Sequence, residues 1–219
     1  MDGGLLEFNS LKTICGLTHG FVLRNDKISV DCHKSEALDR LKPYHEAMVC
    51  SLGFTPDDLC FTEQIHGDFV ATVTNSRGFN DAIPGADGLI TFEKGILLGV
   101  FVADCCAVLI ADRRGRGVSI VHSGKVGSEL GIVRNAIRKF NDQGIISSDL
   151  IVQLSPYIRP PAYEIDFADT IIQDSILLGV PEQSIFDSNE CTSLNLERFY
   201  SYRREKGFTG RMLGLIGLD

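Results

Sequence analysis

Apolar residues along the chain form several short, nearly continuous runs separated by turns rich in Gly and Asp. The most apolar run, ILLGVFVADCCAVLIAD, lacks the alternation expected of a strand with one solvated face. It predicts a pair of buried strands, or one long bent strand, centred on Ala103, Asp104 and Cys105. GVSIVHSG, DLIVQLSP and the apolar C-terminal segment predict further strands. LCFTEQIHG predicts a strand ending at a Gly turn, with DFVATVT as its partner.

Three segments instead show helical spacing of apolar residues. Residues 34–52 predict a helix with a break or kink at Pro43. A second helix is predicted from near Ser128 to Gly144, and FADTIIQDSILLGV predicts a third. The second helix would bury Leu130, Val133, Ile137 and Phe140 on one face. Strands and helices mix irregularly, which favours an α+β or layered sandwich fold over a regular βαβ repeat.

The composition is typical of an ordinary soluble globular protein, with 44% hydrophobic and 23% charged residues. No repeat or linker divides the 219 residues, so a single domain over residues 1–219 is expected. The formal net charge of −8 argues against a nucleic-acid or anionic-membrane partner. A local basic patch could still bind a small anion.

The seven cysteines are odd in number and scattered, with no CxxC pair. The N-terminal segment MDGGLLEFNSLKT lacks the features of a signal peptide, and no apolar stretch is long enough to span a bilayer. We therefore expect a cytoplasmic protein, monomeric or a small homo-oligomer, with most thiols acting as small buried side chains.

Three potential metal ligands sit where a buried strand meets a turn: His66 in EQIHG, Cys105 in VADCC and His122 in IVHSG. They are too far apart in the sequence for a compact zinc finger, so only folding could bring them together. If it does, they form a three-ligand set of the catalytic zinc kind, which activates water at neutral pH. Taken singly, each histidine is more simply a hydrogen-bonded strand-end residue, and Cys105 a core residue.

The polar residue Asp104 interrupts the apolar run beside Cys105. A carboxylate within an apolar strand must be paired, capped or solvated by a cavity. Cys105 and Cys106 alternate in side, so one thiol is expected to face the core and the other a site.

Six segments, in order, resemble the motifs of the YfiH-like family, also called the laccase-domain or multicopper polyphenol oxidoreductase family. The segments are TEQIHGDFV, GADGLIT, VFVADCCAVLIAD, SIVHSGKVGSELGIVRNAI, LSPYIRPPAYEID and FYSYRREKGFTGRM. The family patterns are QxHGxxV, ADALVT, TADCxPVLLAD, VHAGWRG, IGPxIxxxxYEV and SYRRxxxTGR. Because GLTHGF also resembles the family's GVxHGF start, the likeness covers nearly the whole chain from Gly16 onward.

The resemblance implies a layered αββα sandwich of the YfiH and cytotoxic-necrotising-factor type. It also implies a mononuclear metal site, usually taken to hold zinc, made by His66, Cys105 and His122. Family members are associated with phosphorolysis of adenosine, inosine or methylthioadenosine and with deamination of adenosine. On this reading Asp104, Cys105 and His122 are the catalytic candidates.

The chain departs from the family pattern at several positions. HSGKVG replaces HAGWRG, so that Lys125 stands for tryptophan and Val126 for arginine. ADCC places a second thiol, Cys106, beside Cys105. LSPYIRPPAYEID has Ser155 in place of glycine and introduces Arg159. These changes leave a changed substrate or a reduced activity open.

Four residues are expected to bind substrate: Gln64, Lys125, Arg159 and Glu164. Lys125 could restore a cation for phosphate, although a solvated turn lysine is an equally good interpretation. Gln64 could instead orient a ligand by a hydrogen bond, and Glu164 could form a strand-edge ion pair. A further set matching SYRR and TGR either holds an anion or pairs with carboxylates, with the structural role favoured: Arg203, Arg204 and Arg211.

Three other functions compete with a zinc enzyme acting on a purine nucleoside. A metal-free cysteine hydrolase would use Cys105 as nucleophile and His122 as base. A divergent protein could keep the metal without turnover. A copper-dependent phenol oxidase is disfavoured, because one His-Cys-His set offers too few ligands and the sequence has no HxH motif.

Overall fold

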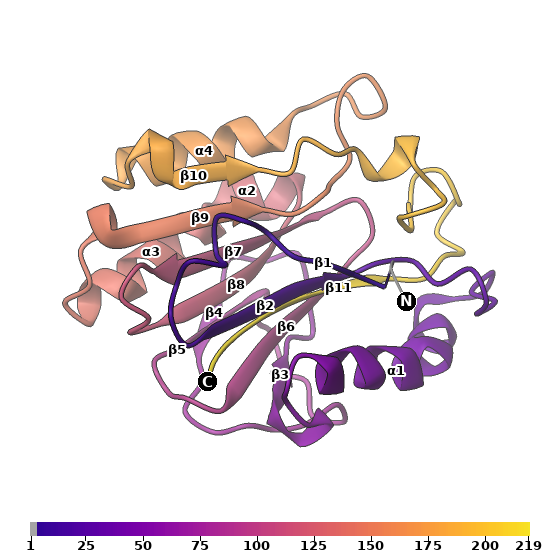
Figure 1. Ribbon diagram of the computed structural model, residues 1–219. Helices are drawn as coiled ribbons and strands as arrows, with labels where there is room; N and C mark the ends of the chain where they lie inside the picture. Colours follow the sequence, from indigo (N-terminus) through magenta and orange to yellow (C-terminus); the bar gives the residue numbers. More distant parts are fainter. Residues whose placement is uncertain (1–3) are drawn as a thin grey trace.

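Two β-sheets pack face to face in the computed structural model, which describes residues 4–219 (Figure 1). Residues 1–3, which begin the segment expected not to be a signal peptide, lie outside the described part. The first sheet has the strand order β1 (Leu5–Leu6), β2 (Leu17–Val22), β11 (Met212–Leu218), β6 (Ile96–Val102) and β3 (Leu59–Phe61). The second has the order β10 (Ile185–Asp187), β9 (Leu150–Leu154), β7 (Cys106–Asp112), β8 (Val118–Ser123), β5 (Gly88–Thr91) and β4 (Val70–Thr72).

The alternation of side chains along each strand sorts them into three apolar layers. In β11, Met212 and Ile216 face the second sheet, whereas Leu213 and Leu215 face helix α1 (Lys34–Ser51) on the outside. The outer face of the second sheet is covered by α2 (Lys125–Leu130), α3 (Ile132–Asp142) and α4 (Phe167–Leu177) (Figure 1). The order of layers is therefore αββα, and the predicted sandwich is confirmed.

The long apolar run at residues 96–112 forms two strands, and these strands belong to different sheets. Strand β6 ends at Val102 in the first sheet, and β7 begins at Cys106 in the second. The residues between them, 103–105, carry the chain from one sheet to the other. Both strands are buried throughout, because each is central in its sheet and covered on both faces.

The expected pairing of LCFTEQIHG with DFVATVT is wrong. Strand β3 pairs in parallel with β6, and β4 pairs in parallel with β5 in the other sheet. The connection between β3 and β4, which contains EQIHG, thus also crosses between sheets. We call these two connections, residues 62–69 and 103–105, the crossings. Each carries polar side chains past the end of a strand in one sheet to the start of a strand in the other.

The helices follow the predicted segments with two differences. Helix α1 continues through Pro43 without ending there. The predicted helix from Ser128 to Gly144 is divided at Gly131, which adopts a left-handed conformation with φ of 83° and ends α2. As a result Leu130 is exposed, while Val133, Ile137 and Phe140 are buried as expected. No helix in the described residues is both long and apolar enough to cross a membrane.

The close contact between the sheets predicts a cost for adding a methyl group at Gly214. A Cβ atom there would lie 2.8 Å from the Cβ of Ala107 in the facing sheet, and neither group can rotate away. We expect Gly214→Ala to lower the free energy of unfolding by about 1–3 kcal/mol in urea denaturation. Gly20→Ala is the matched control, because the three atoms nearest to a Cβ there all belong to the side chain of Leu5, which can rotate away. An equal or smaller loss at Gly214 would contradict this packing.

Candidate metal centre and its cavity

Three potential metal ligands meet where the two crossings approach β8. His66 lies in the connection after β3, Cys105 immediately precedes β7, and His122 lies in β8. One ligand atom from each residue lies within 4.8 Å of the others, and the two imidazole rings are nearly perpendicular. Gly124 leaves room for this arrangement, because a Cβ there would lie 2.6 Å from the sulfur of Cys105.

The donor set fits a single transition-metal ion. Two imidazole nitrogens and one thiolate are ligands for zinc, at ~2.0–2.3 Å from the ion, and also for copper. Three protein ligands leave a further coordination position for water or substrate.

The buried carboxylate of Asp87 joins the two histidine-bearing segments. One oxygen accepts hydrogen bonds from Nδ1 of His122 and the backbone N–H of His66, both at 2.9 Å. The other accepts from the N–H groups of Ile65 and Gly67 at 3.0 and 2.7 Å. Because Nδ1 of His122 donates to Asp87, its Nε2 is left for the metal or for Cys105.

Asp87 was missed in the sequence reasoning, although it stands in GADGLIT beside a buried strand. Its side chain is fully inaccessible, and a buried carboxylate must be paired or capped. Burial alone would raise the pKa of Asp87, but hydrogen bonds from His122 and the nearby amides hold it below the ordinary value. The group is therefore an anion that orients one ligand and the backbone of the other.

The thiol and the imidazole of the site shift each other's protonation. Burial would raise the pKa of Cys105, but His122 and His66 lower it to about 6. Burial would lower the pKa of His122, but the Cys105 thiolate and Asp87 raise it to about 9. Without a metal, each group therefore favours the charged form of the other.

Three residues around the centre adopt left-handed backbone conformations that are rare outside glycine: Gln64, His66 and Asp104, with φ of 63°, 64° and 81°. Gln64 is held by a pair of hydrogen bonds to the backbone of Phe101, at 2.6 and 2.8 Å. Both polar ends of its amide are therefore occupied. Gln64 lines the cavity, and its hydrogen bonds to Phe101 hold the segment that carries His66 against β6.

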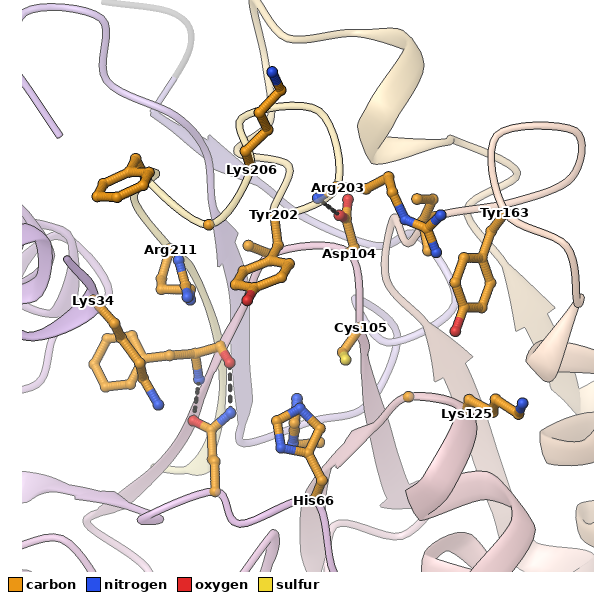
Figure 2. Close-up of a pocket in the computed structure, with 18 of the residues that line it drawn as sticks. Lys34, His66, Asp104, Cys105, Lys125, Tyr163, Tyr202, Arg203, Lys206 and Arg211 are labelled. Carbon is orange, nitrogen blue, oxygen red and sulfur yellow. Dashed lines mark hydrogen bonds between the residues drawn. The ribbon is translucent and has the colours of Figure 1, made fainter. Parts of the chain in front are cut away.

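Both carboxylate oxygens of Asp104 are also occupied. One accepts from the hydroxyl of Thr192 at 2.7 Å, and the other accepts from the backbone N–H of Arg203, also at 2.7 Å. Figure 2 shows the bond to Arg203. The side chain is buried at the cavity wall. Asp104 thereby attaches the C-terminal segment carrying Tyr202 and Arg203 to the residue preceding Cys105.

A cavity of about 770 Å³ opens above the three ligands. Its walls contain several aromatic rings, including those of Tyr163 and Tyr202, which Figure 2 shows with Cys105 between them. Its charged lining is mainly basic, in contrast to the acidic chain as a whole. Within residues 4–219, the basic residues of the lining are Lys34, Lys125, Arg203, Lys206 and Arg211, and its one carboxylate is that of Asp104.

Of the four predicted substrate-binding residues, Gln64 and Lys125 line the cavity, whereas the other two do not. Lys125 lies at the edge of the cavity, exposed, with its side chain directed away from Cys105 (Figure 2). Arg159 and Glu164 do not line the cavity. Arg159 pairs with Asp187 and stacks over Tyr157 with its guanidinium carbon 4.1 Å from the ring centre. Glu164 is exposed and lies 3.4 Å from Arg203.

The second thiol, Cys106, is buried in the layer between the second sheet and the helices. Its sulfur lies 3.8 Å from the hydroxyl of Ser155, and burial raises its pKa. Ser155 also accepts a hydrogen bond from the N–H of Ala107 at 3.0 Å. Two departures from the family pattern, Cys106 and Ser155, therefore contact each other away from the cavity.

The sequence of the chain is similar to those of known proteins. The family model described as multi-copper polyphenol oxidoreductase laccase matches residues 26–174 and 165–219. The chain is 32% identical over 192 residues to the purine nucleoside phosphorylase YlmD of Geobacillus stearothermophilus, covering 71% of this chain and 70% of that protein. It is 28% identical to a purine nucleoside phosphorylase of Staphylococcus saprophyticus, covering 97% and 96%.

Solved structures share the fold. The crystal structure of YlmD from Geobacillus stearothermophilus superposes with a TM-score of 0.86 at 24% identity, covering all of this chain and 97% of that one. The YfiH protein of Bacillus licheniformis superposes with a TM-score of 0.81 at 23% identity, covering 93% of each chain.

The hydrogen bonds of Asp87 predict that its removal weakens metal binding. We expect Asp87→Asn to lower metal affinity by about 10–100-fold, because the amide cannot serve as the same anionic acceptor. Affinity is measured by competition with a chromogenic chelator. Asp112→Asn is the matched control, since Asp112 is equally inaccessible but pairs with Arg116 at the far end of β7. Equal affinities in the two variants would contradict the role of Asp87.

The shifted protonation of Cys105 predicts its reactivity in metal-free protein. The rate of iodoacetamide labelling of Cys105, followed by mass spectrometry, should rise with pH to a midpoint near 6, because the two histidines stabilise the thiolate. His122→Asn should move the midpoint upward. A wild-type midpoint near the ordinary thiol value of about 8.5 would show that the histidines do not act on this thiol.

Proposed function

Since the chain belongs to the multi-copper polyphenol oxidoreductase laccase family, we propose that it is a zinc-dependent enzyme that cleaves purine nucleosides with phosphate. Adenosine, inosine and methylthioadenosine are the proposed substrates, and deamination of adenosine is a second proposed activity. The relatives named as purine nucleoside phosphorylases support the substrate class. The observation that carries the proposal is the His66–Cys105–His122 cluster at the base of the cavity.

The cavity has the dimensions and lining that a nucleoside requires. A volume of about 770 Å³ lies within the range of ~300–1,000 Å³ for small-molecule sites. The rings of Tyr163 and Tyr202 offer faces and hydroxyl groups to a purine and its ribose. The basic lining offers partners for phosphate.

In phosphorolysis, a phosphate oxygen forms a bond to C1′ of the ribose while the bond from C1′ to the purine nitrogen breaks. The departing purine keeps the electron pair and takes up a proton. The chain's part is to hold the phosphate and the sugar in line and to exclude water from C1′. Asp104 contributes by fixing the wall that carries Tyr202 and Arg203.

When bound, zinc supplies a Lewis acid and a means of activating water, which deamination of adenosine requires. The pair of imidazoles and the thiolate would hold it, with Asp87 fixing His122. The same donors occur in copper electron-transfer sites, which add a weak axial ligand such as Met. No methionine lines this cavity among residues 4–219, and the open side faces a volume suited to a substrate. We therefore propose zinc.

A cysteine hydrolase is the second candidate function. His122 lies between the Cys105 thiol and the Asp87 carboxylate, which is the order of nucleophile, base and orienting acid. The low pKa of Cys105 supports this arrangement. The two candidates differ in their need for a metal.

Replacement of Cys105 tests the proposed function. In metal analysis and in product assays with adenosine or inosine, with and without phosphate, we expect Cys105→Ser to lose bound zinc. Activity should fall by about 100-fold or more, because loss of a ligand exceeds the 10–100-fold effect of losing an outer hydrogen bond. Ribose 1-phosphate formed only with phosphate reports phosphorolysis, and inosine from adenosine reports deamination.

Cys15→Ser is the control, because Cys15 is exposed and does not line the cavity. Unchanged zinc and activity in Cys105→Ser would refute the site. A wild-type enzyme that is active without metal but blocked by alkylation would favour the hydrolase.

A further inference from the structure

The buried guanidinium of Arg211 forms no salt bridge within residues 4–219, although the charges of Cys105 and Asp104 act on it across the cavity. Only 8% of the residue is exposed, and it lines the cavity. Nη1 donates to the carbonyl oxygens of Thr209 and Gly210 at 2.9 and 2.8 Å. The donors on Nε and Nη2 find no protein acceptor in the described chain, although an arginine offers five N–H groups.

The position of Arg211 is fixed from behind by helix α1. The imidazole of His45, which is buried in that helix, lies 3.2 Å from the backbone carbonyl oxygen of Arg211. A carbonyl can only accept, so Nε2 of His45 is the donor. Burial lowers the pKa of His45 to about 4, so the ring is neutral and adds no charge behind the guanidinium.

The same helix brings a second cation to the same wall. Lys34 is the first residue of α1, lines the cavity, and forms no ion pair within the described residues (Figure 2). Burial and the charge of Arg211 lower the pKa of Lys34, so the two cations repel each other. The residue before it, His33, provides no side-chain cap for the helix. First-turn N–H groups and the positive end of the helix dipole favour a bound anion.

The other basic residues of the cavity are less suited to this task. Arg203 is exposed and pairs with the carboxylate of Glu164 at 3.4 Å. Lys125 is exposed and directed away from Cys105 (Figure 2). Lys206 is exposed, as Lys34 is, but it lies in a turn of the C-terminal segment and not at the start of a helix. Arg211 is the one buried guanidinium in the cavity lining of the described chain.

We propose that Arg211, Lys34 and the first turn of α1 form a binding subsite for a phosphate group, on the wall opposite Lys125. A planar guanidinium, an ammonium group and free backbone amides together match the oxygens of a phosphate dianion. That this subsite holds the attacking phosphate during turnover rests on the proposed function. That it binds a phosphate group at all does not rest on that function.

Equilibrium binding tests the subsite. Isothermal titration calorimetry of the metal-loaded chain uses inorganic phosphate and, separately, adenosine 5′-monophosphate. We expect Lys34→Gln to weaken Kd by about tenfold, the effect of losing one charge-assisted hydrogen bond. Lys27→Gln is the matched control, because Lys27 is exposed and does not line the cavity, so that its replacement removes the same charge outside the proposed subsite. Its Kd should stay within about twofold of the wild-type value.

The two ligands distinguish the source of the phosphate. Weaker binding of inorganic phosphate by Lys34→Gln identifies free phosphate, and weaker binding of the nucleotide alone identifies a phosphate ester. Arg211→Gln should weaken the same ligand further, with thermal melting as a check on folding. The proposal is overturned if neither ligand binds the wild type, if Lys34→Gln binds as tightly as Lys27→Gln, or if Lys125→Gln alone loses binding.

The outcome separates this subsite from the proposed function. Phosphate binding that depends on Lys34 in a protein without phosphorolysis leaves the subsite standing and removes the function. Phosphorolysis with an unchanged KM for phosphate in Lys34→Gln leaves the function standing and removes the subsite's part in turnover.

Discussion

The carboxylate of Asp87 is the interaction on which the candidate metal centre depends. It lies fully buried at the start of β5 and accepts hydrogen bonds from three successive backbone amides and from His122. These bonds fix the turn that presents His66 and orient the imidazole of His122. A carboxylate in this position cannot be left unpaired, so the two histidine segments and the acid stabilise one another.

The fold explains why ligands distant in sequence meet here. The chain passes between the sheets at residues 62–69 and again at residues 103–105, and the crossings lie beside the end of β8. Regular sheet pairing stops at such crossings, which frees backbone and polar side chains for a site. The left-handed conformations of His66 and Asp104 occur at these points. The hydrogen bonds of Gln64, Asp87 and Asp104 offset that strain.

The sequence predicted the layers and the meeting of His66, Cys105 and His122 better than it predicted the cavity walls. Apolar runs identified most strands, and family motifs identified His66, Cys105 and His122. Strand partners could not be deduced, because β3 and β4 look like a hairpin but belong to different sheets. Motif likeness also could not show that Arg159 and Glu164 face away, since their orientation depends on Asp187 and Arg203. The role of Asp87, and the lack of a salt bridge to Arg211 within residues 4–219, became visible only with long-range contacts.

The central claim is that His66, Cys105 and His122 bind one metal ion at the base of the cavity. X-ray absorption spectroscopy at the metal edge, on protein with a measured metal content, tests it most directly. The account predicts one zinc ion per chain, with scattering from one sulfur and two imidazole ligands and an open position taken by a light atom. A stoichiometric metal without a sulfur ligand, or a protein that binds no metal when zinc is supplied, would contradict it.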